Sequence, residues 1–338
     1  MPLRQTTRNK TDQSTTLITG AGVIGCHTAR LLAERGGRVL LLDLSPARDA
    51  INTIVKDPLV SVVQCDVTDF HALRELVSTR QVTEIVHTAA LLSTAIREDI
   101  LAGVRVNVMG ATNVLEVARQ LGVERVVLAS SSIVGYPAFG DFKGGFFPED
   151  FPLKSVANRP GSIYAATKVT AEHLGLLYRD LYGVSTVSLR YAAVISAWSG
   201  PGTSVPGRVL STLVAAAQAG EAAVISDPFM VWLGGDEFID ARDCAYANVA
   251  ALDAAAPRQG VYNIGMGKLS SFDDFVRAVT HLYPALQVRL GVQPAGGFAG
   301  FPHIRQAPSD LSMAAMELGW HPAYSLDASV AHFAPLLG

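Results

Sequence analysis

The chain has 338 residues, of which 49% are hydrophobic and 17% are charged, so it is long enough for one large α/β domain with an appended lobe, or for two domains. Its formal net charge of -3 includes no block of basic residues, which argues against nucleic acid or a membrane surface as a partner. The three cysteines, Cys26, Cys65 and Cys244, lie too far apart for a disulfide framework, so we expect reduced thiols and a cytoplasmic location.

The first residues, 1–14, are polar and lack the apolar core of a signal peptide, so we expect a flexible N-terminal arm. After the arm, short apolar runs alternate with longer helical patterns as far as residue 191. No uninterrupted run approaches the roughly 18 apolar residues of a membrane span, so we expect no membrane segment.

The alternation predicts a regular order of strands and helices. Strands are expected over residues 15–19, 38–43, 59–65, 84–87, 126–129 and 184–191. Helices are expected over residues 23–35, 70–79, 104–121 and 162–182, with glycines ending the first and third. Strands that alternate with helices form right-handed βαβ crossovers, so residues 15–191 predict an α/β domain with a Rossmann-type, doubly wound parallel sheet.

Beyond residue 191 this alternation breaks, and glycine and proline gather in residues 196–207 and 291–302. We expect residues 192–338 to form mainly a smaller substrate-binding lobe, with parts that return to the Rossmann domain. The lobe should lie over the carboxyl ends of the strands, where ligands bind in open α/β sheets.

A glycine-rich turn, Gly20-Ala21-Gly22-Val23-Ile24-Gly25, follows the first predicted strand and opens the first helix. Glycines in this G-x-G-x-x-G pattern allow a tight turn and close approach of a pyrophosphate, while the helix N-terminus offers free N–H groups. We therefore assign Gly20, Gly22, Val23, Ile24 and Gly25 to cofactor binding. By itself, such a string also occurs as an ordinary turn.

Acidic residues end the second and third predicted strands. Asp43 lies close to the roughly 20-residue spacing at which a carboxylate accepts the ribose hydroxyls of a dinucleotide. A carboxylate there repels a 2′-phosphate and so predicts NAD rather than NADP, although Asp43 could also serve as a cap or turn residue. Asp66 and Val67 are assigned to the same cofactor, with Asp66 reaching the adenine or instead capping the following helix.

Three serines, Ser130-Ser131-Ser132, end the fifth predicted strand, and Tyr164 and Lys168 share one face of a later helix. A phenol ordinarily ionises near pH 10, and a nearby ammonium lowers its pKa toward neutrality. Such a phenol can take the proton of a CHOH group while a serine hydrogen-bonds the oxygen and hydride leaves for NAD. A lone Tyr–Lys pair is more often structural. The order of glycine turn, acidic strand end, serine strand end and Tyr–Lys pair favours catalysis.

From about Leu17 to Pro322 the sequence resembles the extended short-chain dehydrogenases/reductases, in the group of NAD-dependent epimerases and dehydratases. The matching stretches are DVTD, HTAA, NVMGATNVLEVAR, SSSIVG, YAATK, YGVSTVSLRY, GVYNIG and LGWHP. The resemblance implies that Tyr164 is the acid/base and that Lys168 holds the ribose and lowers the Tyr164 pKa. It also implies that Ser131 is the hydroxyl donor, with Ser132 as the near alternative.

The same resemblance implies cofactor contacts from Ala89 and Ala90, and from Asn107 on the long helix, where a helix-packing role is the alternative. It implies a homodimer through the helices predicted over 104–121 and 162–182. In one departure from the family pattern, the glycine turn is one residue shorter than the usual T-G-x-x-G-x-x-G.

The predicted substrate lobe also departs from nucleotide-sugar members of the family. These usually carry an Asn where this chain has Ala193 and a diphosphate-binding Arg where it has Asp236, although Arg208 or Arg305 could supply the charge. The stretches AALLS, SLRYAAVIS and SGPGTS instead resemble short-chain-type threonine dehydrogenases. This implies Ser93 and Thr203, together with Ser132, as substrate contacts, unless these hydroxyls only satisfy backbone groups.

We therefore predict an NAD-dependent oxidoreductase that dehydrogenates the secondary alcohol of a small hydroxy-amino or hydroxy acid. A nucleotide-sugar epimerase or dehydratase is the alternative, and a non-catalytic NAD-sensing protein is a second one. The eight histidines and the cysteines show neither HxxxH nor CxxC spacing, so no metal site is expected. Asp240 and Asp243 could suggest acid/base work, but helix N-capping suits them better.

Overall fold

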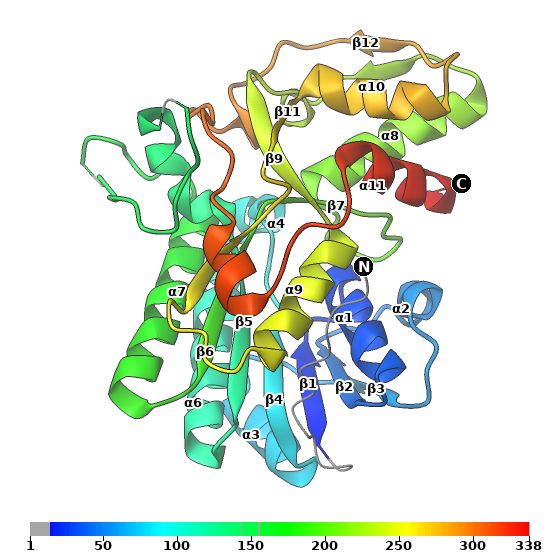
Figure 1. Cartoon of the computed structure of the whole chain (residues 1–338). Helices are drawn as coiled ribbons and strands as arrows, with labels where there is room; N and C mark the ends of the chain where they lie inside the picture. Colours follow the sequence, from blue (N-terminus) through cyan, green and yellow to red (C-terminus); the bar gives the residue numbers. More distant parts are fainter. Residues whose placement is uncertain (1–13, 143, 155, 338) are drawn as a thin grey trace.

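Seven parallel strands form the central sheet of the larger lobe in the computed structural model of the chain (Figure 1). The structure describes residues 14–142, 144–154 and 156–337, so nearly all of the predicted N-terminal arm lies outside the described residues. The strands are β1 (Thr15–Thr19), β2 (Arg38–Asp43), β3 (Val60–Gln64), β4 (Val82–His87), β5 (Arg125–Ser131), β6 (Thr186–Tyr191) and β10 (Val261–Ile264). Their order, β10-β6-β5-β4-β1-β2-β3, confirms the predicted Rossmann-type fold class.

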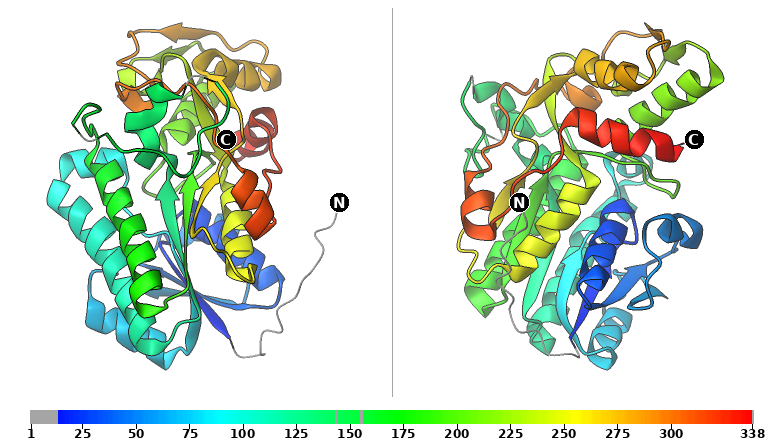
Figure 2. Two further views of the ribbon diagram at one scale, coloured as in Figure 1. Left: turned by 60° about the vertical axis from the view of Figure 1, so that its left-hand side comes forward. Right: turned by 45° about the vertical axis from the view of Figure 1, so that its right-hand side comes forward.

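Helices cover both faces of this sheet (Figure 2). One face carries α1 (Val23–Glu34), α2 (Arg48–Ile54) and α9 (Ala241–Asp253), and the other carries α3 (Phe70–Thr79), α6 (Ala111–Leu121) and α7 (Ile163–Tyr182). In β2, Val39 and Leu41 pack against the first group, whereas Leu40 and Leu42 pack against the second. Because both faces are buried, the inner strands read as continuous apolar runs.

The helix before β5 begins earlier than predicted and is not α-helical throughout. It consists of α5 (Ile100–Val104), a π-helical segment (Arg105–Gly110) and α6. By length and composition the whole helix, Ile100–Leu121, is apolar enough to cross a membrane, with a mean hydropathy of 1.2. This does not contradict the expectation, because polar residues such as Arg105 and Asn107 interrupt the apolar run. The helix nevertheless packs against α3, α7 and the central sheet, as a core helix of a globular domain does.

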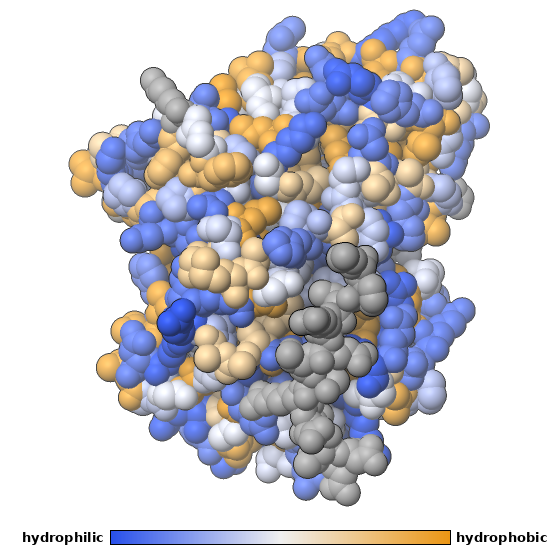
Figure 3. Space-filling view, viewed as in Figure 1, coloured by the Kyte–Doolittle hydropathy of each residue, from blue (hydrophilic) through white to orange (hydrophobic). Residues whose placement is uncertain are grey.

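The smaller lobe contains two short sheets. One is β11 (Leu269–Ser271), β9 (Gly235–Asp240) and β7 (Ala193–Ile195), and the other is β12 (Val288–Leu290) and β8 (Ala223–Ile225). Its helices are α8 (Val205–Ala219), α10 (Phe272–Leu282) and α11 (Leu326–Phe333). Since β7 begins two residues after the carboxyl end of β6, the lobe starts at that edge of the sheet. In the core of the smaller lobe, the Trp232 ring packs against Phe238, Phe272 and Phe298. Figure 3 shows hydrophilic residues interspersed with hydrophobic ones over both lobes.

Two acidic residues at the start of α9 have different roles. The Asp240 carboxylate accepts a hydrogen bond from the Arg242 backbone N–H, which is the predicted N-cap. The capping prediction was wrong for Asp243, because its buried carboxylate accepts hydrogen bonds from the backbone N–H groups of Ala323 and Tyr324. Asp243 therefore links the segment before α11 to α9, which packs on the sheet of the larger lobe.

Candidate active site

The glycine turn between β1 and α1 is tightly packed on its inner side and open on its outer side. Gly20 has a φ of 89°, and a Cβ there would lie 2.6 Å from the backbone nitrogen of Ala89. A Cβ on Gly25 would lie 2.1 Å from the carbonyl oxygen of Gly20, whereas a Cβ on Gly22 would meet nothing within 4 Å. The turn therefore requires two glycines for its own packing, and at the third, the partly buried Gly22, it leaves open space for an approaching ligand.

The N-terminus of α1 has no side-chain cap. Gly22 is the N-cap residue and provides no side-chain hydrogen bond, so N–H groups of the first helical turn, which begins with Val23 and Ile24, stay available. Free N–H groups at the positive end of a helix dipole suit the pyrophosphate of NAD. The predicted residues of the turn therefore fit this cofactor, despite the shortened spacing.

Asp43, at the end of β2, lies directly beside this turn. Its Oδ2 accepts a hydrogen bond from the Ala21 N–H at 2.9 Å, and its Oδ1 accepts one from the Ser45 N–H, also at 2.9 Å. The carboxylate thus supports the turn and occupies the strand end where ribose hydroxyls are bound in dinucleotide folds. The turn role and the ribose role are therefore compatible.

Asp66 and Val67 follow β3. Asp66 does not cap α3, because the N-cap of that helix is Asp69, whose side chain accepts from the Ala72 N–H. The Asp66 carboxylate instead accepts a hydrogen bond from the Thr68 N–H at 2.8 Å. Val67 is buried against Gly110. The cofactor role of both residues stays a prediction.

Asn107 holds the segment after β4 in place. Its side-chain amide accepts from the Leu91 N–H at 2.8 Å and donates to the Leu91 carbonyl at 3.0 Å and to the Thr167 hydroxyl at 3.2 Å. Asn107 lies in the π-helical segment and links three parts of the chain, including the residues that follow Ala89 and Ala90. This geometry supports the packing role rather than direct contact with a cofactor.

The structure brings Ser131, Tyr164 and Lys168 together. Ser131 ends β5, and its side chain hydrogen-bonds the Tyr164 hydroxyl. Tyr164 and Lys168 lie in the first two turns of α7, and the Lys168 Nζ is 5.7 Å from the centroid of the Tyr164 ring. Lys168 also donates to the Ala129 carbonyl at 2.7 Å. Ser132 begins the 3-10 helical segment that follows β5.

Burial controls the protonation of this site. Although the cavity gives access to part of the Tyr164 ring, burial raises the pKa of its hydroxyl to about 12, and the hydrogen bond with Ser131 opposes the rise. Burial lowers the pKa of Lys168 to about 8, against the attraction of Glu172. The Tyr164 pKa was expected to be lowered by Lys168, but in the protein without a ligand it is raised, because burial disfavours the phenolate and the only opposing influence is Ser131.

Sequence reasoning missed a buried ion pair one helical turn beyond Lys168. Arg190 on β6 donates to both carboxylate oxygens of Glu172, at 2.9 and 2.8 Å, and the Ser130 hydroxyl donates to the same carboxylate. These contacts link β5, β6 and α7. They fix the helix that carries Tyr164 and Lys168 relative to the strand that carries Ser131.

A cavity of about 250 Å³ adjoins Tyr164. Its other lining residues are Ser93, Ile96, Arg97, Ile100, Gly161, Ser162, Ile163 and Phe301. Ser93 and Arg97 belong to α4 (Ser93–Glu98), a helix that the sequence did not predict. Of the predicted substrate contacts, Ser93 is a lining residue, whereas Ser132 and Thr203 are not.

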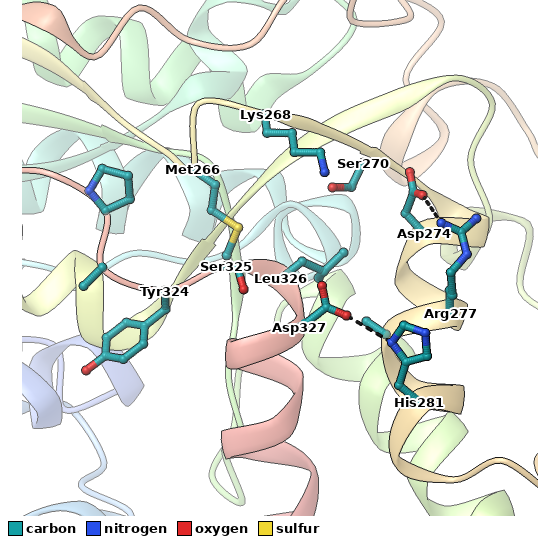
Figure 4. A pocket seen from close by; sticks show the side chains of 13 residues that line it. Met266, Lys268, Ser270, Asp274, Arg277, His281, Tyr324, Ser325, Leu326 and Asp327 are labelled. Atoms are coloured by element: carbon teal, nitrogen blue, oxygen red, sulfur yellow. Dashed lines mark hydrogen bonds and ion pairs between the residues drawn. The ribbon is translucent and has the colours of Figure 1, made fainter.

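A larger cavity of about 390 Å³ lies between β11, α10 and α11 (Figure 4). Among its basic lining residues, Arg277 pairs with Asp274 at 2.9 Å and His281 lies 3.4 Å from Asp327, whereas Lys268 has no ion pair among the described residues. None of the predicted site residues lines this cavity. In the described part of the chain, no group of three or more His, Cys, Asp or Glu could hold a metal ion. The smaller cavity beside Tyr164 is therefore the candidate active site.

Comparison with known proteins identifies the family. The sequence profile of the NAD dependent epimerase/dehydratase family matches residues 16–265. The mitochondrial L-threonine 3-dehydrogenase of Bos taurus is 29% identical over 95% of this chain and 82% of its own length. The dTDP-L-rhamnose 4-epimerase of Burkholderia thailandensis is 28% identical over 93% of this chain and 92% of its own length.

A solved structure supports the same conclusion. The UDP-glucose 4-epimerase of Thermus thermophilus, in complex with NAD, has a TM-score of 0.73 and 26% identity, and the match covers 96% of this chain and 98% of that one. The relatives thus include both dehydrogenases and epimerases. From its matched profile, its glycine turn and its Ser–Tyr–Lys constellation, the chain is an NAD-dependent enzyme that belongs to the NAD-dependent epimerase/dehydratase family.

Proposed function

We propose that this enzyme dehydrogenates the secondary alcohol of a small hydroxy acid or hydroxy-amino acid. The observation that carries the proposal concerns Arg305, the buried arginine that could otherwise hold a diphosphate. Two carboxylates, Asp236 and Glu237, lie beside it and balance its positive charge. The cavity beside Tyr164 supports it, because about 250 Å³ suits a small molecule better than a whole nucleotide sugar.

Arg305 is held by the smaller lobe through its Nε and Nη2, whereas its buried Nη1 makes no hydrogen bond among the described residues. Its Nη2 donates to Glu237 at 2.6 Å and to the Ser309 hydroxyl at 2.7 Å, and its Nε donates to the Ala307 carbonyl. Asp236 lies 3.5 Å from its Nη1. Two carboxylates therefore face one guanidinium, and a dianionic diphosphate there would meet net repulsion. Arg208, the other candidate, pairs with Asp227 at 2.9 Å.

The catalytic groups suit removal of a proton and a hydride from one CHOH group. NAD, when bound, supplies the hydride acceptor. Tyr164 takes the hydroxyl proton, Ser131 hydrogen-bonds the substrate oxygen, and the carbonyl forms as the two electrons of the C–H bond leave with the hydride. Lys168 places a positive charge near the phenol, which favours its ionisation when proton transfer begins.

The alternative is a nucleotide-sugar epimerase or dehydratase. It is supported by relatives such as the dTDP-L-rhamnose 4-epimerase, whose identity nearly equals that of the threonine dehydrogenase. In an epimerase the hydride returns to the same substrate, so no NADH accumulates. The two functions therefore differ in a directly measurable product.

The test is to incubate the enzyme with excess NAD and follow NADH absorbance at 340 nm. Accumulation of NADH with L-threonine or 3-hydroxybutyrate supports the proposal. Conversion of a UDP- or dTDP-sugar without net NADH overturns it in favour of the alternative.

Tyr164→Phe is the matched control for this test. The change should reduce turnover by at least about a thousandfold, because it removes the proton acceptor, and should leave NAD affinity within about twofold. Retained turnover in this variant would exclude Tyr164 from the mechanism.

We also propose that the enzyme is a homodimer, and a cytoplasmic location stays a prediction. Exposed apolar side chains on two neighbouring helices of the larger lobe, among them Leu101 and Leu181, support the dimer.

A further inference from the structure

Arg97 carries the positive charge of the cavity beside Tyr164. It lies four residues after Ser93 on α4, so both side chains share one face of that helix and line the cavity. Among the described lining residues, Arg97 is the only charged one, and none carries a carboxylate. An anionic group entering the cavity would therefore meet attraction without competing repulsion.

The guanidinium of Arg97 is oriented by an aromatic ring from the other lobe. Its central carbon lies 4.5 Å from the centroid of the Phe229 ring, in the short turn Pro228–Met230 of the smaller lobe. Stacking of this kind uses the flat face of a guanidinium and leaves its N–H donors at the edge free for a planar anion. Within the described chain, Arg97 makes no hydrogen bond or ion pair.

The rest of the cavity is suited to a short carbon chain that ends in a polar group. Ile96, Ile163 and Phe301 provide apolar walls, while Ser93 and Tyr164 provide hydroxyls. A molecule that places its alcohol at Tyr164 thus passes an apolar surface before it reaches Arg97. A small secondary alcohol with a carboxylate a few carbons away has this pattern.

We propose that Arg97 binds the carboxylate of the substrate and makes the enzyme specific for acids over neutral alcohols. The inference rests on the proposed dehydrogenase function and adds the group that selects its substrate. A guanidinium and a carboxylate form paired, charge-assisted hydrogen bonds that are stronger than neutral ones. The contact also joins the lobes, since the cation that holds the substrate stacks on Phe229.

The experiment compares acids with neutral alcohols of similar shape. Initial rates of NADH formation are measured for L-threonine and 3-hydroxybutyrate, and for 1-amino-2-propanol and 2-butanol, which lack the carboxylate. Arg97→Ala should raise KM for the acids by about 10- to 100-fold with kcat nearly unchanged, the loss expected for one charge-assisted contact. The kcat/KM for the neutral alcohols should stay the same.

Two further variants sharpen the result. Arg97→Lys keeps the charge but loses the planar pair of donors, so its KM for the acids should fall between those of the wild type and Arg97→Ala. Arg80→Ala removes an exposed arginine at the end of α3 that lines neither cavity, and it should change no rate. Equal loss for acids and neutral alcohols in Arg97→Ala, or no loss for either, would overturn the proposal.

A binding measurement separates this inference from the proposed function. Calorimetry on the NAD-loaded enzyme should show that butyrate binds more tightly than butyramide, and that Arg97→Ala abolishes the difference. Butyrate selectivity that depends on Arg97, without NADH formation from any acid, would refute the dehydrogenase function and leave the carboxylate site standing. Butyrate and butyramide binding equally to the wild type would refute the site.

Discussion

Burial shifts the pKa values of Tyr164 and Lys168 in opposite directions because it disfavours the charged form of each. The phenol is held neutral and the ammonium is held close to its titration point, with a pKa of about 8. The free enzyme therefore contains a protonated Tyr164 at neutral pH, and the phenolate that oxidation requires must be favoured by what binds beside it.

The Lys168 pKa predicts how stability depends on pH. Its ordinary value is 10.5, so between about pH 8 and 10.5 the unfolded chain holds this proton and the folded protein does not. The free energy of unfolding therefore increases as pH rises through this window. Below the window Lys168 is charged in both states, and burial of its charge destabilises the folded protein in full. Lys168→Met, which has no charge, should be more stable than wild type at pH 7 by on the order of 2 kcal/mol.

Urea unfolding of both proteins at pH 7 and pH 9.5 checks this prediction. The stability difference should shrink at the higher pH, since wild-type Lys168 is then largely neutral in the folded state. Comparing the two proteins cancels the titration of groups that they share. A difference that does not change with pH would show that Lys168 is not the titrating group.

Asp43 provides a test of cofactor choice at a single residue. Asp43→Asn keeps an acceptor for the Ala21 N–H but loses the charge, whereas Asp43→Ala loses both. If charge repulsion excludes NADP, both variants should reduce the preference for NAD over NADP by about 10-fold or more. Only Asp43→Ala should also loosen the glycine turn.

Dissociation constants for NAD and NADP, measured by quenching of protein fluorescence, check the change in cofactor preference. Unchanged selectivity in both variants would refute the ribose assignment.

In the turn between β1 and α1, one glycine is needed for the stability of the fold and another for cofactor binding, so substitutions there can separate the two effects. Gly25→Ala forces a Cβ against the Gly20 carbonyl, a rigid backbone neighbour, so it should destabilise the protein by about 1–3 kcal/mol and weaken NAD binding. Gly22→Ala finds open space in the protein without NAD, so its melting temperature should stay near that of wild type. Its NAD affinity should still fall about 10-fold or more, because the methyl group occupies the approach of the phosphates.

Thermal denaturation with and without NAD checks both variants. The ligand should raise the melting temperature of wild type, since it binds only the folded state, and should raise that of Gly22→Ala much less. A large NAD-induced shift in Gly22→Ala would mean that the pyrophosphate does not approach this glycine.

Elements with strong local patterns could be predicted from the sequence, and those defined by distant contacts could not. The run RVLLLD predicts β2 correctly because a strand buried on both faces must be apolar throughout. β10 has only four residues, and its place beside β6 depends on a pairing that local pattern does not encode. The π-helical segment at Arg105–Gly110 and the short strands of the smaller lobe likewise lack a local signal.

The same distinction applies to the site. Ser131, Tyr164 and Lys168 were predicted because their order along the chain is specific, and the fold brings them together. The pKa of Tyr164 was predicted in the wrong direction, since desolvation depends on packing that the sequence does not state. The position of Arg97 could not be predicted, because it depends on a cavity and on Phe229, which is far away in the sequence.

At the scale of the whole molecule, the exposed apolar side chains of two neighbouring helices predict self-association. Leu101 on α5 is 77% exposed and Leu181 on α7 is 65% exposed, and further exposed apolar residues outside the cavity accompany them, namely Val104, Met109 and Leu177. The helix from Ile100 to Leu121 runs beside α7, as the left view of Figure 2 shows. Exposed apolar side chains gathered on neighbouring helices are typical of an interface, and the two helices would pack against the same pair of a second copy.

We therefore expect wild type to sediment as a dimer at micromolar concentration in analytical ultracentrifugation. Leu101→Glu combined with Leu181→Glu should shift it to a monomer, because the desolvation of two carboxylates in an apolar interface costs more free energy than the apolar contact contributes. Leu336→Glu, at a 62% exposed leucine near the carboxyl end and away from both helices, is the matched control and should stay dimeric. A monomeric wild type would refute the dimer. Dissociation by Leu336→Glu instead would place the interface on the smaller lobe.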